Sequence, residues 1–90
     1  MRAYNWKEYS KAYCEKIILH ERNDDDTLCL YEAFNEDVWN VQYFLVYKDK
    51  VVYEGYDYNE MIYKFWGMKE LITHLKEEGE LKEWKIKNFM

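Results

Sequence analysis

The segment from Val38 to Lys48 constrains the fold most strongly, because it combines strand-forming residues with apolar side chains on both faces. Val, Tyr, Phe and Trp favour strands, and successive side chains point to opposite faces of a strand. We therefore predict a central strand that is at least partly covered on both sides. A tight connection at 48–50 leads into a return strand over Val51–Glu54, which ends at Gly55. This pattern predicts an antiparallel hairpin.

An amphipathic helix is predicted after this hairpin. Asp57 or Asn59 is a suitable N-cap, and Gly79 is a suitable C-cap. Gly67 lies inside the pattern and predicts a kink or a break into two helices, because glycine costs about 1 kcal/mol relative to alanine in a helix interior. The apolar stripe that defines the helix, with spacings of four and three residues, consists of Met61, Phe65, Met68, Ile72 and Leu75.

The N-terminal half of the chain predicts one more helix and one more hairpin. Residues 4–16 carry an apolar stripe at helical spacing, with Asn5 as the N-cap. Two apolar runs, 17–19 and 27–34, then flank the polar cluster 23–26, which predicts an antiparallel hairpin around a turn. The alternative is that the first helix continues to about His20.

The last segment, Leu81–Phe89, alternates Trp84 and Ile86 with charged residues and predicts an edge strand that lysines protect from further pairing. The predicted order is therefore α-β-β-β-β-α-β. The fold class that we expect is α+β, with one antiparallel sheet of four to five strands and two helices. Ninety residues leave no room for a second domain, so we expect 1–90 to be a single domain.

The composition excludes several classes of protein. Aromatic residues make up 20% of the chain, which argues against disorder, and ten tyrosines are too many to bury completely in a domain of this size. The N-terminus lacks the apolar core of a secretory signal, and no apolar run approaches the roughly 20 residues that span a membrane. We therefore expect a cytoplasmic protein without a membrane partner, in which both cysteines are reduced thiols.

Residue types that could carry chemistry lack the spacing that the chemistry requires. The acids near His20 lack the spaced calcium-binding loop, so we expect no metal and no cofactor. A cysteine–histidine pair using Cys14 or Cys29 has no supporting motif, and burial is the better interpretation of both thiols. Three glycines provide no phosphate-binding loop, and no clear basic stripe predicts direct nucleic-acid binding. We therefore predict that the protein is not an enzyme.

The negative charge is concentrated in one short stretch. The net charge is −5, whereas residues 21–37 alone hold seven acids against one arginine, a sum of −6. Like charges in proximity repel, so the stretch is either solvated loop or faces something positive. Acids at both ends of one strand, about 26 Å apart, would also imitate DNA phosphates coarsely. The predicted contact set for a basic protein surface is Asp24, Asp25, Asp26, Tyr31, Glu32, Glu36, Asp37, Tyr56, Asp57, Tyr58 and Glu60.

In overall character, the chain resembles small phage-encoded anti-defence proteins, anti-CRISPR and anti-restriction inhibitors in particular. The likeness lies in the single small domain, the acidic balance, the missing enzyme motifs and the many tyrosines. It implies an inhibitor that occupies the basic nucleic-acid groove of a CRISPR nuclease or a similar enzyme in a bacterial host cell. The alternative is a small structural or regulatory domain that forms a homodimer through its last strand and its surplus aromatic residues.

Overall fold

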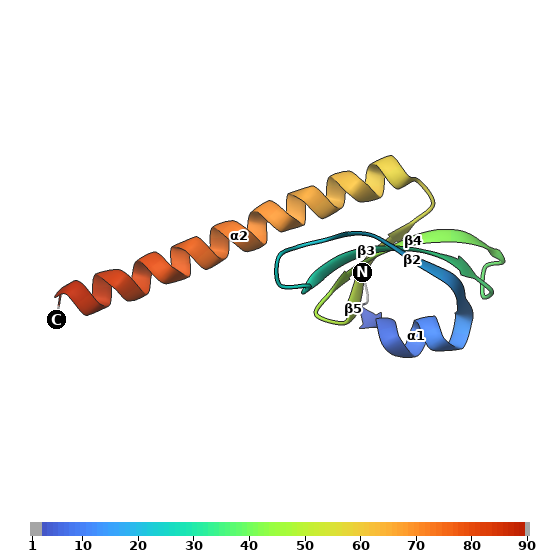
Figure 1. Ribbon diagram of the computed structural model, residues 1–90, viewed down its shortest axis with the longest axis horizontal. Coiled ribbons are helices and arrows are strands. Elements are labelled where there is room, and N and C mark those ends of the chain that lie inside the picture. The colour runs from blue at the N-terminus through green and yellow to red at the C-terminus, as the bar shows by residue number, and fades with distance from the viewer. Residues whose placement is uncertain (1–2, 90) are drawn as a thin grey trace.

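The computed structural model describes the backbone of residues 3–89 and the side chains of residues 3–75. The α+β class is confirmed, since the described residues form two helices and one antiparallel sheet with the strand order β1-β5-β4-β3-β2 (Figure 1). The elements are β1 (Tyr4–Asn5), α1 (Trp6–Tyr13), β2 (Cys14–Arg22), β3 (Leu28–Asn35), β4 (Asn40–Tyr47), β5 (Lys50–Gly55) and α2 (Tyr58–Phe89).

The sheet lies between the two helices, with α1 on one face and α2 on the other (Figure 1). On the α1 face, Trp6 packs with Phe44 and Val46 from β4. On the α2 face, Met61 and Phe65 pack against leucines of β3 and β4. Each face buries its own apolar cluster, which is the main driving force for this arrangement.

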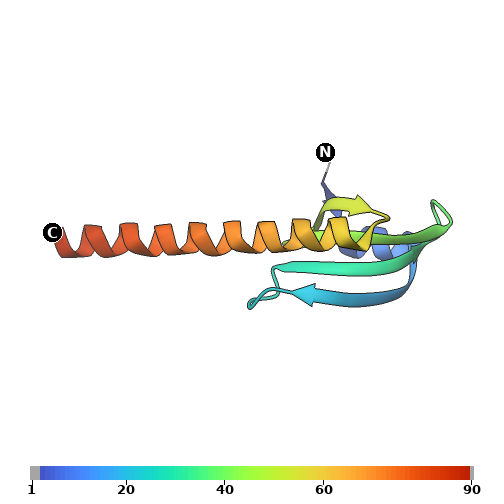
Figure 2. The ribbon, with the colours of Figure 1, turned by 90° about the horizontal axis from the view of Figure 1, so that it is seen from above.

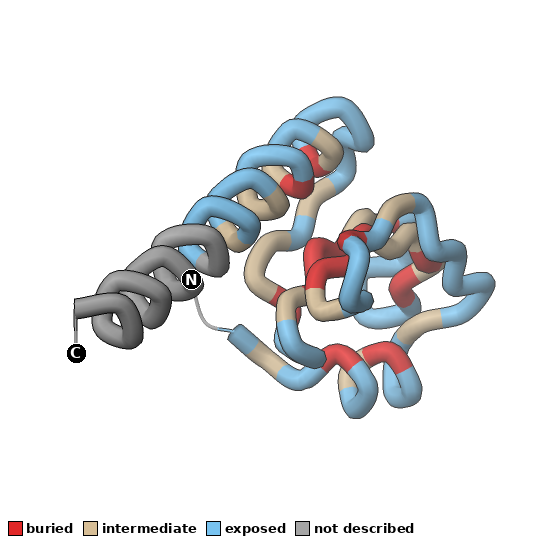
Figure 3. The backbone as a smooth tube through the Cα atoms, turned by 60° about the vertical axis from the view of Figure 1, so that its left-hand side comes forward, coloured by how far each residue is buried: buried red, intermediate tan, exposed pale blue. Residues whose placement is uncertain are grey.

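The central position predicted for the 38–48 strand is confirmed. β4 pairs with β3 in an unbroken register from Leu28↔Tyr47 to Asn35↔Asn40, and with β5 on its other side. Phe44 and Leu45, which are neighbours in sequence and point to opposite faces, are both fully buried. Figure 3 shows the buried residues on the sheet, on α1 and on the first turns of α2.

The first helix is shorter than predicted. Asn5 is its N-cap, as expected, and its side chain accepts a hydrogen bond from the Glu8 amide. The helix ends at Tyr13, because Cys14 already pairs with Asn35 in β2. A helix to residue 16 or to His20 is therefore wrong, whereas the hairpin around residues 23–26 is confirmed. Pairing with β3 outweighed the local helical pattern.

The second helix is longer than predicted. Asp57 caps it, with its carboxylate accepting from the Asn59 amide at 3.0 Å. The helix then runs through Gly67 and Gly79 without interruption, so the predicted break, the C-cap at Gly79 and the edge strand over 81–89 are all wrong. Glu and Lys are good helix formers, and a short alternation around Trp84 cannot by itself distinguish a strand from a helix. The fifth strand is instead β1, which pairs with β5.

The antiparallel order divides the turns between two ends of the sheet. The β2–β3 and β4–β5 turns lie at one end, called here the Asp24 end. The β3–β4 turn and the start of α2 lie at the other, called the Trp39 end. α2 begins at the Trp39 end, crosses the sheet and extends well past the Asp24 end (Figures 1 and 2). Among the described residues, no helix combines the length and apolar character needed to cross a membrane.

Candidate protein-binding surface

An apolar patch is exposed at the Trp39 end, on the face of the sheet that α2 covers elsewhere. Phe34 and Val41 are directly opposite each other on β3 and β4, and Trp39 packs edge-on against Phe34 with ring centroids 5.2 Å apart. Ile18 is opposite Glu32, which lies two residues before Phe34 and therefore on the same face. These four residues, Ile18, Phe34, Trp39 and Val41, form what we call the Trp39 patch.

Trp39 is the most exposed member of the patch and has an unusual backbone. Trp39 is 76% exposed to solvent. Its backbone φ is 54°, in the left-handed region. Bulky residues rarely adopt this conformation, which costs about 1–2 kcal/mol. A large aromatic side chain held in water on a strained backbone contributes little to folding. Backbone strain of this kind is often found at functional sites.

Carboxylates border the Trp39 patch. Glu15 is directly opposite Phe34, so Val41, Phe34 and Glu15 form one row across three strands. The Glu36 carboxyl hydrogen-bonds to Glu15, and this bond, together with the repulsion between the two charges, raises the pKa of Glu36. Asp37 follows, with its amide donating to the Asn35 side chain at 2.9 Å. Like charges from β2 and from the β3–β4 turn therefore lie together at the border of the Trp39 patch.

Glu32 belongs to the same surface and has defined partners. Its Oε1 lies 2.9 Å from His20 Nε2. The His20 ring also packs against Tyr43 and Tyr58, with centroids 5.9 and 5.2 Å away. Burial first, and the Glu32 charge second, raise the pKa of Tyr43. This cluster joins the middle of the sheet to the first residue of α2 and bounds the Trp39 patch on that side.

The predicted contact residues at the start of α2 lie at the same end of the molecule. Tyr56 and Tyr58 are exposed, and Glu60 is an exposed acid in the first turn of the helix. Asp57 is also exposed, but its carboxylate caps the helix. The structure therefore brings the following predicted residues to the Trp39 end: Glu32, Glu36, Asp37, Tyr56, Asp57, Tyr58 and Glu60.

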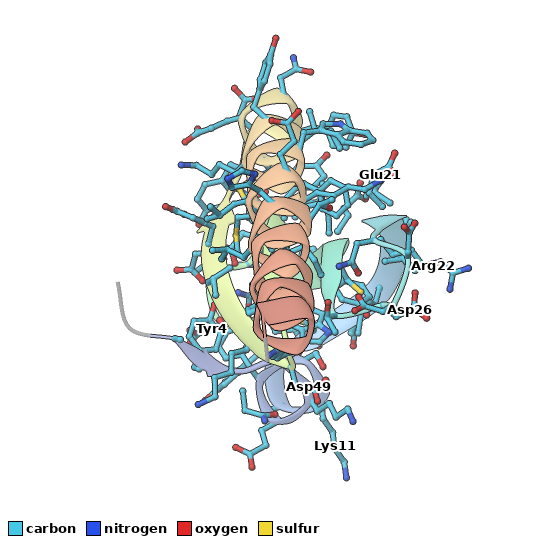
Figure 4. The ribbon with its side chains drawn as sticks, turned by 90° about the vertical axis from the view of Figure 1, so that its left-hand side faces the viewer. Tyr4, Lys11, Glu21, Arg22, Asp26 and Asp49 are labelled. Carbon is cyan, nitrogen blue, oxygen red and sulfur yellow. The ribbon has the colours of Figure 1, made fainter. Side chains whose placement is uncertain are left out.

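The aspartates 24–26 lie at the opposite end, and two of them stabilise their own turn. Asp25 Oδ1 accepts hydrogen bonds from the Thr27 hydroxyl at 2.7 Å and from the Thr27 amide at 3.3 Å. Asp26, with a φ of 60°, pairs with Arg22 at 3.2 Å, and Figure 4 shows this pair together at one edge of the molecule. The strand β3 separates this turn from the Trp39 end, as the sequence predicted.

Tyr31 does not belong to either acidic group. It lies on the α1 face and stacks on Trp6, with ring centroids 5.0 Å apart. Burial first, and the nearby Cys29 second, raise the pKa of Tyr31 to about 12. Its role is in the core, where it extends the aromatic packing around Trp6.

The two cysteines are free, with Cys29 buried and Cys14 half-buried. Burial is the largest cause of a raised pKa at both thiols, which lowers the thiolate fraction that a nucleophile needs. No group of three or more His, Cys, Asp or Glu side chains is placed to hold a metal ion in the described part of the chain.

The sequence did not identify the Trp39 patch, and Glu15 was not among the predicted contacts. The pattern of β4 predicted cover on both faces, whereas Val41 is exposed because α2 begins only near Tyr43.

Comparison with protein-family models, curated proteins and solved structures finds no match to the chain. The surface at the Trp39 end is therefore the main structural feature from which a function can be inferred.

Proposed function

We propose that the chain is a non-enzymatic protein-binding module that inhibits a nucleic-acid enzyme by covering its basic surface. The observation that carries this proposal is the exposed Trp39, which packs on Phe34 in the centre of an apolar patch bordered by carboxylates. Protein interfaces commonly have an apolar centre and a polar rim, and tryptophan is enriched among the residues that dominate binding energy.

The charge of the rim specifies the chemistry of the partner. Glu15 and Glu36 lie close together in the free protein, where a hydrogen bond to Glu15 first, and repulsion from its charge second, raise the pKa of Glu36. An arginine or lysine of a partner placed between them would relieve this repulsion and form charge-assisted hydrogen bonds. Acidic residues would also increase the rate of encounter with a basic surface. A groove that binds DNA or RNA is such a surface, because it must neutralise phosphates.

More specifically, we propose that the chain inhibits a CRISPR-type nuclease in the cytoplasm of a bacterial host. The Trp39 end, rather than the aspartates 24–26, would make the contact. Two of those aspartates are already engaged within their turn, and all three lie at the far end of β3. Binding should weaken as salt rises and should compete with nucleic acid.

The test is a tagged pull-down from bacterial lysates that contain CRISPR nucleases, washed at stepped salt concentrations. We expect a nucleic-acid enzyme to be recovered and then displaced by DNA or guide RNA. Glu36→Lys and Trp39→Gly should each lower recovery at least tenfold. Asp24→Lys makes the same change of charge as Glu36→Lys at the opposite end, and should retain most of the binding.

Two outcomes would contradict the proposal. If Asp24→Lys abolishes binding and Glu36→Lys does not, the contact surface has been assigned to the wrong end. If nucleic acid fails to displace the captured protein, the chain does not act by covering a nucleic-acid groove.

A further inference from the structure

A hollow beside α1 lies on the face of the sheet opposite the Trp39 patch. It has a volume of about 240 Å³ and is lined by Tyr4, Asn5, Glu8, Tyr9, Ala12 and Tyr13. Tyr4 and the N-cap Asn5 come from β1, and the other lining residues come from α1. Because tyrosines dominate its wall, we call it the tyrosine hollow.

The three tyrosine rings form a continuous row. The ring centroids of Tyr4 and Tyr9 are 4.7 Å apart, with the planes inclined by 54°. Those of Tyr9 and Tyr13 are 5.0 Å apart, with the planes inclined by 48°. Tyr4 and Tyr9 also pack on the buried cluster around Trp6, which fixes their positions, whereas Tyr13 is 42% exposed. The row therefore offers a preformed aromatic surface to a group that enters the hollow.

Carboxylates surround this row of rings. The Tyr4 hydroxyl donates a hydrogen bond to the Glu54 carboxylate, and burial first, then this bond, raise the pKa of Tyr4. Burial also raises the pKa of Tyr9; a hydrogen bond to its hydroxyl opposes the rise, and the charges of Asp37 and Glu54 add to it. Glu8 contributes a carboxylate to the wall of the hollow itself. The hollow therefore favours a cation.

The nearby lysines point away from the hollow. Lys7 and Lys11 lie two positions before and after Tyr9, and residues two apart on a helix project from different faces. Figure 4 shows Lys11 pointing away from the rest of the molecule. Lys50 is directly opposite Tyr47, which packs on the α2 face, so its side chain belongs to that face as well. None of these three lysines cancels the negative charge beside the rings.

Hydrogen bonding narrows the class of cation. The Tyr4 hydroxyl is engaged as described above, and the Tyr9 hydroxyl accepts from Asn35 at 2.8 Å. Asn5 Oδ1 accepts from the Glu8 amide at 3.0 Å. A primary ammonium or a guanidinium carries several N–H donors that need acceptors, whereas a trimethylammonium carries none and is held by contact with aromatic faces. The hollow therefore suits a methylated ammonium group.

We propose that the tyrosine hollow binds a trimethylammonium group, which lies against the tyrosine rings while Glu8 balances its charge. A phenol that donates a hydrogen bond to a carboxylate gains electron density, so the bond to Glu54 strengthens the attraction of the Tyr4 ring for a cation. The hollow and the Trp39 patch lie on opposite faces of the sheet, so this site does not depend on the function proposed above. Choline and the side chain of trimethylated lysine both carry the group.

Titration of the isotope-labelled full chain with choline chloride, followed by NMR at constant ionic strength, tests the proposal. We expect saturable shifts of the α1 amide signals with a dissociation constant of about 1–20 mM, because each contact of a cation with an exposed ring is weak. The neutral alcohol in which carbon replaces the charged nitrogen of choline has the same shape. It should bind at least fivefold more weakly.

Blocked lysine derivatives distinguish the two sources of the group. Trimethyllysine, acetylated at its amine and amidated at its carboxyl, should shift the same signals, and unmethylated lysine blocked in the same way should bind at least fivefold more weakly. Tighter binding of the trimethyllysine derivative than of choline assigns the site to a protein side chain. Tighter binding of choline assigns it to a small molecule, and either order supports the site.

Matched variants test the assignment to these residues. Tyr13→Leu keeps an apolar side chain but removes one ring, and Glu8→Gln removes the charge; each should weaken choline binding at least threefold. Tyr63→Leu and Glu70→Gln make the same changes on α2, where Tyr63 is 78% exposed, and should leave binding unchanged. Circular dichroism checks that each variant folds, and the exposed Glu8 keeps the test usable if Tyr13→Leu does not fold.

Three outcomes would overturn the proposal. The first is the absence of saturable shifts up to about 50 mM choline. The second is equal binding of choline and the neutral alcohol, which would show that the charge has no part in binding. The third is a set of shifts centred on Trp39 or Trp66, which would place the choline on other exposed aromatic residues.

Discussion

Asn35 joins the first helix to the base of the β3–β4 turn through Tyr9. Its side-chain Nδ2 donates a hydrogen bond to the Tyr9 hydroxyl at 2.8 Å and another to Gln42 Oε1 at 2.6 Å. Its Oδ1 accepts from the Asp37 amide at 2.9 Å. Asn35 is fully buried, so one side chain at the end of β3 connects α1, β4 and the turn that carries Trp39.

We expect Asn35→Ala to lower the free energy of unfolding by about 1–3 kcal/mol, because it leaves the buried Gln42 acceptor without this donor. Chemical denaturation measures the loss. Tyr9→Phe removes one of the same hydrogen bonds without emptying the site, and should cost only about 0.5–1.5 kcal/mol. Equal losses in the two variants would show that the Asn35–Gln42 contact contributes nothing.

Trp39→Gly is expected to keep or raise the stability of the domain, although it removes the largest side chain of the exposed patch. Glycine adopts a positive φ without strain, which offsets the greater entropy of the unfolded chain. We expect a change within about 0.5 kcal/mol or a small gain, measured by thermal unfolding. A loss above about 2 kcal/mol would show that Trp39 is a structural residue, and would remove the main support for the binding surface.

Glu36→Gln is expected to stabilise the protein at neutral pH and to have no such effect in acid. The pKa of Glu36 in the folded state is raised above its usual 4.5, so the folded state keeps this proton to a higher pH than the unfolded state. Stability from this group is therefore present below pH 4.5 and is lost as pH rises through the folded pKa. Glutamine cannot ionise, so it avoids that loss.

Urea unfolding of the wild type and of Glu36→Gln at about pH 4 and pH 7 checks this difference. Glu70→Gln makes the same chemical change at an exposed position on α2 and serves as the control. An advantage of Glu36→Gln that is equal at both pH values would mean that repulsion from Glu15 is not its cause.

Asp49→Gly is expected to stabilise the β4–β5 hairpin. Lys48 and Asp49 both have positive φ, at 48° and 66°, which is the pattern of a two-residue type I′ turn. Glycine is preferred at the second position of this turn, so we expect a gain of about 0.4–1 kcal/mol in thermal or chemical unfolding. The Asp49 carbonyl, which accepts from the Trp6 amide at 2.8 Å, is kept in the variant. A loss of stability would show that the Asp49 side chain has a role of its own.

Local physics explains which parts of the fold could be predicted from the sequence. Turn-forming side chains and strand formers defined both hairpins; in the first, Asn23 accepts a hydrogen bond from the Leu28 amide. The stripe from Met61 to Ile72 defined a helix, and its buried members pack on the sheet as the spacing predicted. The error over 81–89 arose because a few alternating residues do not distinguish a strand from a helix.

The sequence by itself determined the two predicted hairpins and the helix that begins after Asp57, because turns, caps and hydrophobic periods act between neighbouring residues. It also determined that the acids at 24–26 and 36–37 lie at opposite ends of one strand. Only the tertiary structure decided which of these acids lie beside an exposed apolar surface, because burial depends on where the helices lie on the sheet. Trp6 covers Tyr31, whereas α2 begins too late to cover Val41 and leaves Trp39 in water. Which side chains remain exposed is a property of packing between distant segments, and local sequence patterns do not encode it.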